Sequence, residues 1–354
     1  MIKYVTGLCL FLFFSHSTQA WNAEGHMVVA QIAYNHLNPV AKAACNNLIA
    51  VPLTYSSSGT SNFVTAAVWA DDFKSQLGSG IWHYIDLPFS LDGTSTSGVA
   101  IASFDVVQAI NLSVATLQEP GATQSNKAVS LRYLLHFAGD IQQPLHCSTA
   151  VTASHPGGDA GGNSFFITGN WSNLHSLWDS GGGFLTDSLN RPLSTASQNT
   201  LNAKVAAIEA DYPYDYSANP GTIPDPMDWA QEGLTLAMTV SYVGITQNSA
   251  PSGAYLNTAM ATTEQRMAAG GHRLADLLNT LFPANPIMLT PFAGQEGNFS
   301  FSWGAVSNSV YKVQWKLHLS DPTWNDLTNI TASSNSVIFT DKLLQPQRFY
   351  RVAQ

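Results

Sequence analysis

The chain has 354 residues, of which 45% are hydrophobic, so it is long enough for one large folded domain and a smaller second one. Its 23 acidic side chains outnumber its 14 basic ones, for a formal net charge of −9. A protein that binds duplex nucleic acid derives much of its affinity from phosphate neutralisation by Lys and Arg, so this charge balance argues against that class.

The first twenty residues have the pattern of a secretory signal peptide. Lys3 is followed by the apolar run Leu8 to Phe14 and by a polar stretch that ends in Ala20. We predict cleavage between Ala20 and Trp21 and export of the mature protein, to the periplasm or the cell exterior. Removal of Lys3 leaves 13 basic and 23 acidic side chains, a formal charge of −10. The apolar run is too short to span a bilayer and no later run reaches about 18 residues, so no transmembrane segment is predicted.

Two cysteines, Cys45 and Cys147, remain after that cleavage. A pair of cysteines in an exported protein favours one disulfide bond. The sequence does not show whether their Cα atoms lie close enough to be bridged, so two buried thiols are the alternative.

Apolar periodicity predicts a mainly α region that extends to about residue 285. The first helix should begin near His26, because Val28, Val29 and Ile32 recur at helical spacing. A later helix should end near Lys74. Further helices are expected over residues 39–50, 104–117, 173–179, 195–210, 227–245 and 254–282, with a short strand over residues 164–168 in a glycine-rich loop.

The composition changes after Pro286. The segments FSFSW, YKVQWKLHL, VIFTD and FYRV alternate apolar and polar residues and are separated by Asn, Ser, Pro and Asp. This alternation is typical of short antiparallel strands. We therefore expect a signal peptide at 1–20, a helical domain at 21–285, and at 286–354 a small C-terminal β-sandwich that resembles fibronectin type III modules.

The stretch LLHFAGDIQQPLH, from Leu134 to His146, places three potential metal ligands together. In a helix, His136 and Asp140 lie one turn apart on the same face, about 5–6 Å from each other. Pro144 should end the helix, so a turn would aim His146. A carboxylate has two oxygens, and Asp140 could bridge two metal ions. A buried helix with hydrogen-bonded core histidines is the alternative.

Together with these three residues, six more with imidazole, carboxylate or amine groups give nine candidate ligands, many of them in local aromatic contexts. Imidazole and carboxylate without cysteine suit zinc and leave room for manganese or iron. Nine ligands exceed the need of one tetrahedral ion and fit three ions if one carboxylate bridges. Outside this pattern, His36, His155, His272 and His318 are interpreted as surface or core residues. The candidate ligands are Trp21 with its free amine, His26, Asp71, His83, His136, Asp140, His146, His175 and Asp179.

In chain order, WNAEGH, WADDFK, WHYID, LLHFAGDIQQPLH, GGN and NLHSLWD resemble the motifs of the zinc-dependent single-strand nuclease and 3′-nucleotidase family, which is distantly similar to bacterial zinc phospholipase C. The resemblance covers roughly residues 21 to 282. It implies a mainly α, zinc nuclease/phospholipase C-like fold with three Zn²⁺ ions per chain. Its ligand pattern assigns Asp71, His83, His136 and Asp140 to one zinc, His146, His175 and Asp179 to a second, and the Trp21 amine and carbonyl, His26 and bridging Asp140 to a third.

The resemblance also implies residues that act on the substrate. Asp86 matches the position that activates or orients the attacking water, and hydrogen-bonded support of the ligand His83 is an alternative role. Lys74 falls where many relatives carry Arg, and either cation can neutralise phosphate. Tyr84 matches an aromatic that stacks on a base, although a core role is equally compatible with the sequence. Asn163, Ser180 and Gly181 are further candidates for a base pocket.

The predicted protein is a secreted zinc-dependent hydrolase, an endonuclease and 3′-nucleotidase. Its substrates would be single-stranded DNA and RNA, cleaved to 5′-phosphorylated products, and 3′-nucleotides. We expect a monomer that forms no stable nucleic-acid complex. A zinc-dependent phospholipase C is the alternative, but those enzymes carry Glu at the position of Asp179. A zinc-sequestering or adhesive protein, a different class, is disfavoured because Asp86 and Lys74 are intact.

Overall fold

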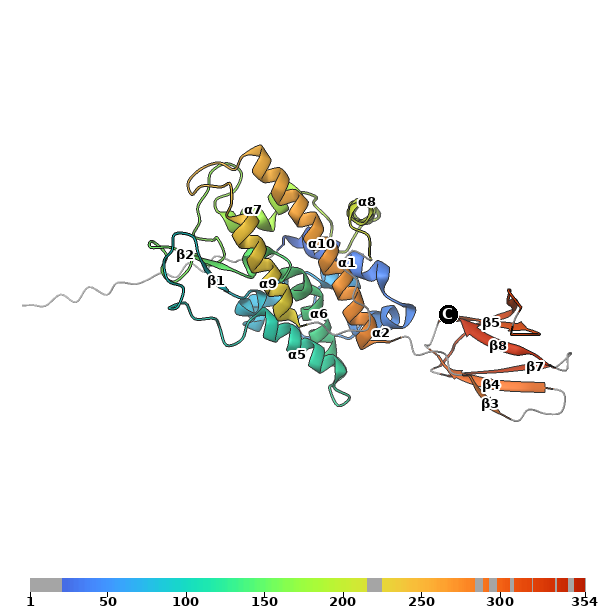
Figure 1. The fold of residues 1–354 in the computed structure, drawn as a ribbon. Coiled ribbons are helices and arrows are strands. Elements are labelled where there is room, and N and C mark those ends of the chain that lie inside the picture. Colours follow the sequence, from blue (N-terminus) through green and yellow to red (C-terminus); the bar gives the residue numbers. More distant parts are fainter. Residues whose placement is uncertain are drawn as a thin grey trace, which may run out of the picture.

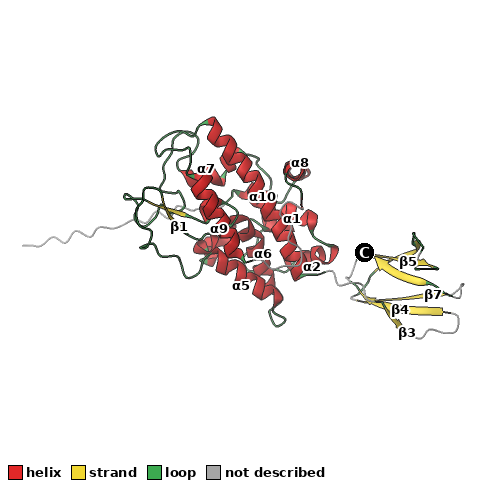
Figure 2. Ribbon diagram, viewed as in Figure 1, coloured by secondary structure: helices red, strands yellow, loops and turns green. Residues whose placement is uncertain are grey.

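The computed structural model describes residues 21–214, 225–283, 289–292, 298–305, 309–319, 321–334, 336–342 and 347–353. The predicted signal peptide at 1–20 and Pro286, where the β region was expected to begin, lie outside these ranges. Helices dominate up to residue 283, and strands make up the C-terminal part (Figures 1 and 2). Within the described ranges, no helix has the length and apolar character needed to cross a membrane.

The helical part begins earlier than its periodicity indicated. The side chain of Asn22 accepts a hydrogen bond from the Gly25 N–H and caps the first helix, which therefore starts at Ala23 instead of near His26. The described helices are α1 (Ala23–His36), α2 (Pro39–Ile49), α3 (Phe63–Ala66), α4 (Trp69–Leu77), α5 (Val106–Gln118), α6 (Gln124–Asp140), α7 (Leu174–Asp179), α8 (Thr195–Asp211), α9 (Pro226–Leu236) and α10 (Gly253–Leu281). Shorter turns are the 3-10 helices η1 (Ser58–Thr60), η2 (Gly80–His83), η3 (Pro144–His146) and η4 (Gly181–Gly183), and the π-helical η6 (Ala237–Ser241), which continues α9.

Three local predictions are corrected. The helix before Lys74 is two helices, α3 and α4, separated by a turn. The central helix α6 ends at Asp140, four residues before Pro144, which instead begins η3. The predicted strand at residues 164–168 is wrong, since this loop makes an isolated bridge from Phe166 to Asn173.

Helix α6 lies inside the helical part and is buried along its C-terminal half. Leu131, Leu134 and Phe137 are completely inaccessible to solvent, as are His136 and Asp140. α5 packs along α6, and α1 packs along α10 (Figure 1). Burial of charged groups on such a helix is costly unless they are paired or bind a metal, so the position of α6 already marks His136 and Asp140 as unusual.

A parallel pair of short strands, which the sequence did not indicate, joins two ligand-bearing segments. β1 (Pro88–Ser90) pairs with β2 (Thr149–Val151), with Phe89 opposite Ala150. Beside this pair the Ile85 N–H donates to the carbonyl of His146 at 2.8 Å. The chain after η2 is thereby held against the chain after η3.

The predicted disulfide is wrong. Cys45 and Cys147 are both free, buried thiols. Cys45 is on α2, which packs mainly on α6, whereas Cys147 follows η3, which packs mainly on α9, so the two side chains face different neighbours. Burial raises the pKa of Cys45 to about 12 and raises that of Cys147 further, so both stay protonated and unreactive.

The C-terminal part contains two antiparallel three-stranded sheets. One has the order β3 (Thr290–Phe292), β4 (Asn298–Gly304), β7 (Ser336–Lys342), and the other β6 (Asn325–Thr331), β5 (Val310–Lys316), β8 (Phe349–Ala353). Residues from both sheets, including Phe301, Trp303, Tyr311 and Val313, form one apolar core. The prediction of a mainly α fold with a small C-terminal β-sandwich is confirmed, while the exact domain boundaries stay a prediction.

Candidate metal centre

Four of the candidate ligands meet around the carboxylate of Asp140, the last residue of α6. Asp140 Oδ2 lies 3.0 Å from Nδ1 of His83, at the end of η2, and 3.3 Å from Nε2 of His136, one turn earlier on α6. Asp71 enters from α4, with Oδ1 3.7 Å from each of the same two nitrogens. The group predicted to hold one ion is therefore assembled from three separate elements.

His26, on α1, joins this cluster at the other carboxylate oxygen of Asp140. Its Nε2 lies 3.4 Å from Oδ1, and its ring stacks on that of His136 with centroids 3.8 Å apart. Both ring nitrogens of His26 are buried and have no hydrogen-bond partner among the described residues. Buried nitrogens of this kind are rare in folded proteins, and a bound ion would give one of them a partner.

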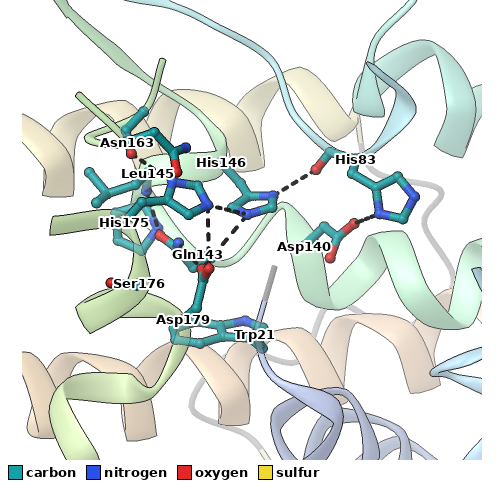
Figure 3. A network of polar contacts seen from close by, with 12 residues as sticks. Trp21, His83, Asp140, Gln143, Leu145, His146, Asn163, His175, Ser176 and Asp179 are labelled. Carbon is teal, nitrogen blue, oxygen red and sulfur yellow. Dashed lines mark hydrogen bonds and ion pairs between the residues drawn. The ribbon is translucent and has the colours of Figure 1, made fainter. Parts of the chain in front are cut away.

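Trp21 lies next to these residues and is completely buried. Its indole Nε1 donates to the carbonyl of Gly139 at 3.0 Å. The N–H of Asn22 donates to the carbonyl of Asp179 at 3.0 Å, so the backbone at Trp21 runs between the cluster around Asp140 and the next one (Figure 3).

A second cluster consists of His146 from η3 with His175 and Asp179 from α7 (Figure 3). The Nε2 atoms of the two histidines are 3.1 Å apart. Asp179 Oδ2 lies 3.5 Å from Nε2 of His175, and Oδ1 lies 3.9 Å from Nε2 of His146. The side chain of Asn173 accepts from the Ser176 N–H and caps α7. The helix therefore begins at Leu174 and contains both His175 and Asp179, which lie one turn apart.

Backbone carbonyls set the direction of three imidazoles. Each Nδ1–H can donate to a carbonyl oxygen, which leaves the Nε2 lone pair facing the cluster, the arrangement typical of metal ligands. The pairs are His136 with Ala67 at 2.6 Å, His146 with His83 at 2.8 Å and His175 with Gly161 at 2.7 Å. The Nε2 lone pairs of His146 and His175 then face each other, and a cation bound between them would remove their repulsion. Two nitrogens on one tetrahedral zinc ion lie roughly 3.3 Å apart, at bonds of about 2.0 Å, so the observed spacing fits zinc.

Burial and mutual charges give the clustered groups very different proton affinities. Burial, with the neighbouring His136, lowers the pKa of His26 to about 3. Burial alone would lower the pKa of His136, but the carboxylates of Asp140 and Asp71 raise it to about 9. Burial raises the pKa of Asp179 well above its usual value. Metal ligands must be deprotonated, so a bound cation would have to displace the second ring proton that His136 otherwise holds near neutral pH, and it would oppose the rise in the pKa of Asp179.

The predicted catalytic residues flank these clusters. Lys74 Nζ donates to Asp71 Oδ1 at 3.3 Å. Tyr84 and Asp86 are half-buried and lie on either side of Ile85, whose N–H bonds to His146. Burial and the charge of Asp159 raise the pKa of Asp86 to about 6. A half-buried carboxylate with a raised pKa, next to clusters of imidazoles and carboxylates, has the properties of a general base.

The three candidates for a base pocket have local hydrogen-bonding or turn roles. Asn163 donates its amide to the carbonyl of Ala160 at 2.8 Å. The Ser180 hydroxyl accepts from Trp171 Nε1 at 2.7 Å. Gly181 is buried, and its φ of +62° forms the turn after α7, a conformation that favours glycine. Substrate contact by these three residues stays a prediction.

Two supporting residues were not identified from the sequence. Gln143 donates Nε2 to Asp179 Oδ1 at 2.8 Å, and its place inside the motif GDIQQPLH was an available signal. Asp159 accepts from the Gly162 N–H at 3.1 Å and from the Tyr242 hydroxyl at 2.6 Å, which fixes the glycine loop. That loop supplies the Gly161 carbonyl to His175. The position of Asp159 in a glycine-rich stretch was the available signal. The backbone carbonyls that accept from the imidazoles leave no signal in the sequence.

Curated relatives align with about three quarters of the chain. Endonuclease 2 of Arabidopsis thaliana is 27% identical over 77% of this chain and 93% of its own length. Nuclease P1 of Penicillium citrinum is 27% identical over 74% of this chain and 97% of its own length. Nuclease S1 of Aspergillus oryzae is 29% identical over 75% and 92% of the two chains. A solved structure of Clostridium perfringens alpha-toxin covers 92% of this chain and 85% of its own at 11% identity, and its TM-score of 0.32 is too low to carry an argument.

The sequence model described as S1/P1 Nuclease matches residues 21–283, the stretch that contains every candidate ligand. This match covers well over half of the chain, and the aligned relatives named above are nucleases. The chain therefore belongs to the S1/P1 nuclease family, and its helical part is that of a nuclease, a hydrolase of nucleic acids.

Proposed function

We propose that the protein is a secreted, zinc-dependent single-strand nuclease and 3′-nucleotidase with three Zn²⁺ ions per chain. The observation that carries this proposal is the inward direction of the imidazole lone pairs, above all the 3.1 Å approach of His146 Nε2 to His175 Nε2. The first zinc would be held by Asp71, His83, His136 and Asp140, the second by His146, His175 and Asp179, and the third by Trp21, His26 and Asp140.

Asp140 is suited to bridge two ions because its two oxygens face different ligands. Oδ2 faces His83 and His136, whereas Oδ1 faces His26. When bound, the zinc ions supply positive charge for the phosphoryl oxygens and activate water. Asp86 accepts the proton of the attacking water, and the ammonium of Lys74 adds charge at the edge of the cluster. The local positive charge offsets the acidic composition of the chain where a polyanion must bind.

The proposed substrates are single-stranded DNA and RNA, cleaved to 5′-phosphorylated products, and 3′-nucleotides. Tyr84 is half-buried beside the clusters, so part of its ring remains accessible for stacking on an unpaired base. The similarity of the chain to nucleases favours nuclease activity over phospholipase C activity. The enzyme would act as a monomer without a stable nucleic-acid complex, and a separate domain at 286–354 would follow the catalytic domain at 21–285.

One assay tests both the metal and the substrate. Purified protein is given 3′-AMP or 5′-AMP, and release of inorganic phosphate is measured before chelation, after chelation and after zinc is restored. We expect phosphate release from 3′-AMP and none from 5′-AMP. The chelator should abolish this release, and added zinc should restore it. Equal release from both nucleotides, or undiminished release in chelator, would contradict the proposal.

A further inference from the structure

A separate group of ligand-type side chains lies outside the centre described above. His36 is the last residue of α1, Glu209 lies near the end of α8 and His272 lies in the middle of α10. One ligand atom of each lies within 4.8 Å of the other two. We propose that His36, Glu209 and His272 form a fourth metal site, which binds a divalent transition-metal ion of the zinc type and ties the three helices together.

Both imidazoles direct Nε2 toward the same carboxylate oxygen. His36 Nε2 contacts Glu209 Oε1 directly, and His272 Nε2 lies 3.9 Å from that oxygen. A distance of 3.9 Å is too long for a hydrogen bond. It is close to the roughly 3.3 Å that separates two ligand atoms on one tetrahedral zinc ion. Small side-chain rotations would therefore bring the three atoms to metal-binding distances.

Neighbouring residues hold the two rings in place. The His36 ring stacks on Tyr214 at 4.4 Å with an interplanar angle of 13°, and meets the His272 ring edge-on at 5.3 Å. The Tyr214 hydroxyl donates to Asp276, one turn after His272 on α10. Asn279 Nδ2 donates to the His36 carbonyl at 3.0 Å. The end of α1 is thus fixed against α10 through contacts that need no ion, so the ligands are preorganised.

The site can be reached from the surface on the side of α8. His272 is completely buried, but the side chains of Glu209 and His36 are 21% and 27% exposed. Glu209 also lines a surface cavity of about 520 Å³, together with Gln198 and Asn202. An ion could enter here and keep one coordination position for water. Two imidazoles and one carboxylate are a donor set that suits zinc and neighbouring transition metals, whereas calcium and magnesium prefer oxygen ligands alone.

The direct test is a metal count on matched variants. His36→Phe keeps an aromatic ring against Tyr214 and removes both nitrogens. The control, His318→Phe, removes an exposed imidazole in the loop after β5, outside the ligand clusters of the described residues. Each protein is saturated with zinc, freed of unbound metal by gel filtration and analysed for zinc per chain. We expect one ion fewer per chain in His36→Phe than in the parent and in His318→Phe, with nuclease activity within about twofold in all three.

Two further measurements make the answer independent of how His36→Phe folds. Glu209→Gln should also lose one zinc per chain. Crystals of the parent protein soaked in zinc should show an anomalous peak between the three side chains. Equal zinc content in the parent and Glu209→Gln, or anomalous peaks at the other clusters with none between His36, Glu209 and His272, would overturn the proposal.

Discussion

Gly25 lies one turn after Trp21, and the replacement Gly25→Ala tests whether the position of Trp21 matters. A methyl group at Gly25 would lie 2.6 Å from Trp21 Cβ and 3.0 Å from atoms of Leu185 and Met267. Ordinary contact begins at 3.4 Å, so Trp21 must move by most of an ångström or the helix must shift. Trp21 Cβ is fixed to the backbone, so a change of rotamer cannot relieve this contact.

The expected cost in stability follows from two opposing effects. Overpacking a dense core costs about 1–3 kcal/mol. Alanine in a helix is favoured over glycine by about 0.5–1 kcal/mol. The net loss should be about 1–2 kcal/mol, or a fall in the melting temperature of about 2–8 °C for a domain of this size. If Trp21 is a metal ligand as proposed, a displacement of this size should also reduce nuclease turnover about tenfold or more.

The measurements are thermal unfolding, zinc per chain and 3′-nucleotidase turnover for the parent, Gly25→Ala and a control. Gly253→Ala is the matched control, because Gly253 is also near the start of a helix and a methyl group there meets nothing within 4 Å. The control should be as stable as the parent or slightly more stable, with full activity. Normal zinc content and turnover in Gly25→Ala would show that Trp21 is not a ligand whose position matters. An unchanged melting temperature would refute the packing argument.

The remaining predictions concern the metal ligands and the substrate. Asp140→Asn should bind less zinc and show only background activity, because the amide cannot bridge two ions. Full zinc content with normal turnover would make Asp140 a structural residue. Tyr84→Ala should keep its zinc and lose about 5- to 150-fold in single-strand cleavage, the equivalent of 1–3 kcal/mol of stacking, and equal parent rates on duplex and single strands would remove that argument. A general base must be deprotonated, so activity should fall as the pH drops through the pKa of Asp86, which is about 6 without bound cations and lower with them. Asp159→Asn removes the charge that, after burial, helps to raise this pKa and should move the fall in the pH profile to lower pH; an unmoved profile would show that the charge of Asp159 does not tune the group that titrates. One extra Ala before Trp21 converts the amine into an amide without an available lone pair, so the exported variant should bind one zinc fewer, and three zinc ions with full activity would demote Trp21 to a packing residue.

Much of the fold and of the candidate site was predicted from patterns between residues that are close in the chain. The spacing of His136 and Asp140, and of His175 and Asp179, is four residues, and in each case a helix places both side chains on one face. Alternation in the last seventy or so residues was sufficient to predict strands, because one face of each strand lines a common core. These features depend on neighbours in the chain and are therefore visible in a single sequence.

Other features depend on which distant segments meet. β1 and β2 are three residues each and pair across about sixty residues of chain, too short a pattern to recognise. Cys45 and Cys147 looked like a disulfide pair, but α2, which carries Cys45, and η3, which precedes Cys147, pack mainly on different helices.

By itself, the sequence determined the mainly helical fold, the β-sandwich, the family resemblance and the identity of the candidate ligands, because helical and strand periodicity and short motifs are local properties of the chain. Only the tertiary structure decided how the imidazoles are directed, since their partners are the carbonyls of Ala67, His83 and Gly161, which no side-chain pattern reveals. It also decided the grouping of His36 with His272, two histidines without a motif, because three helices must pack together before their side chains become neighbours.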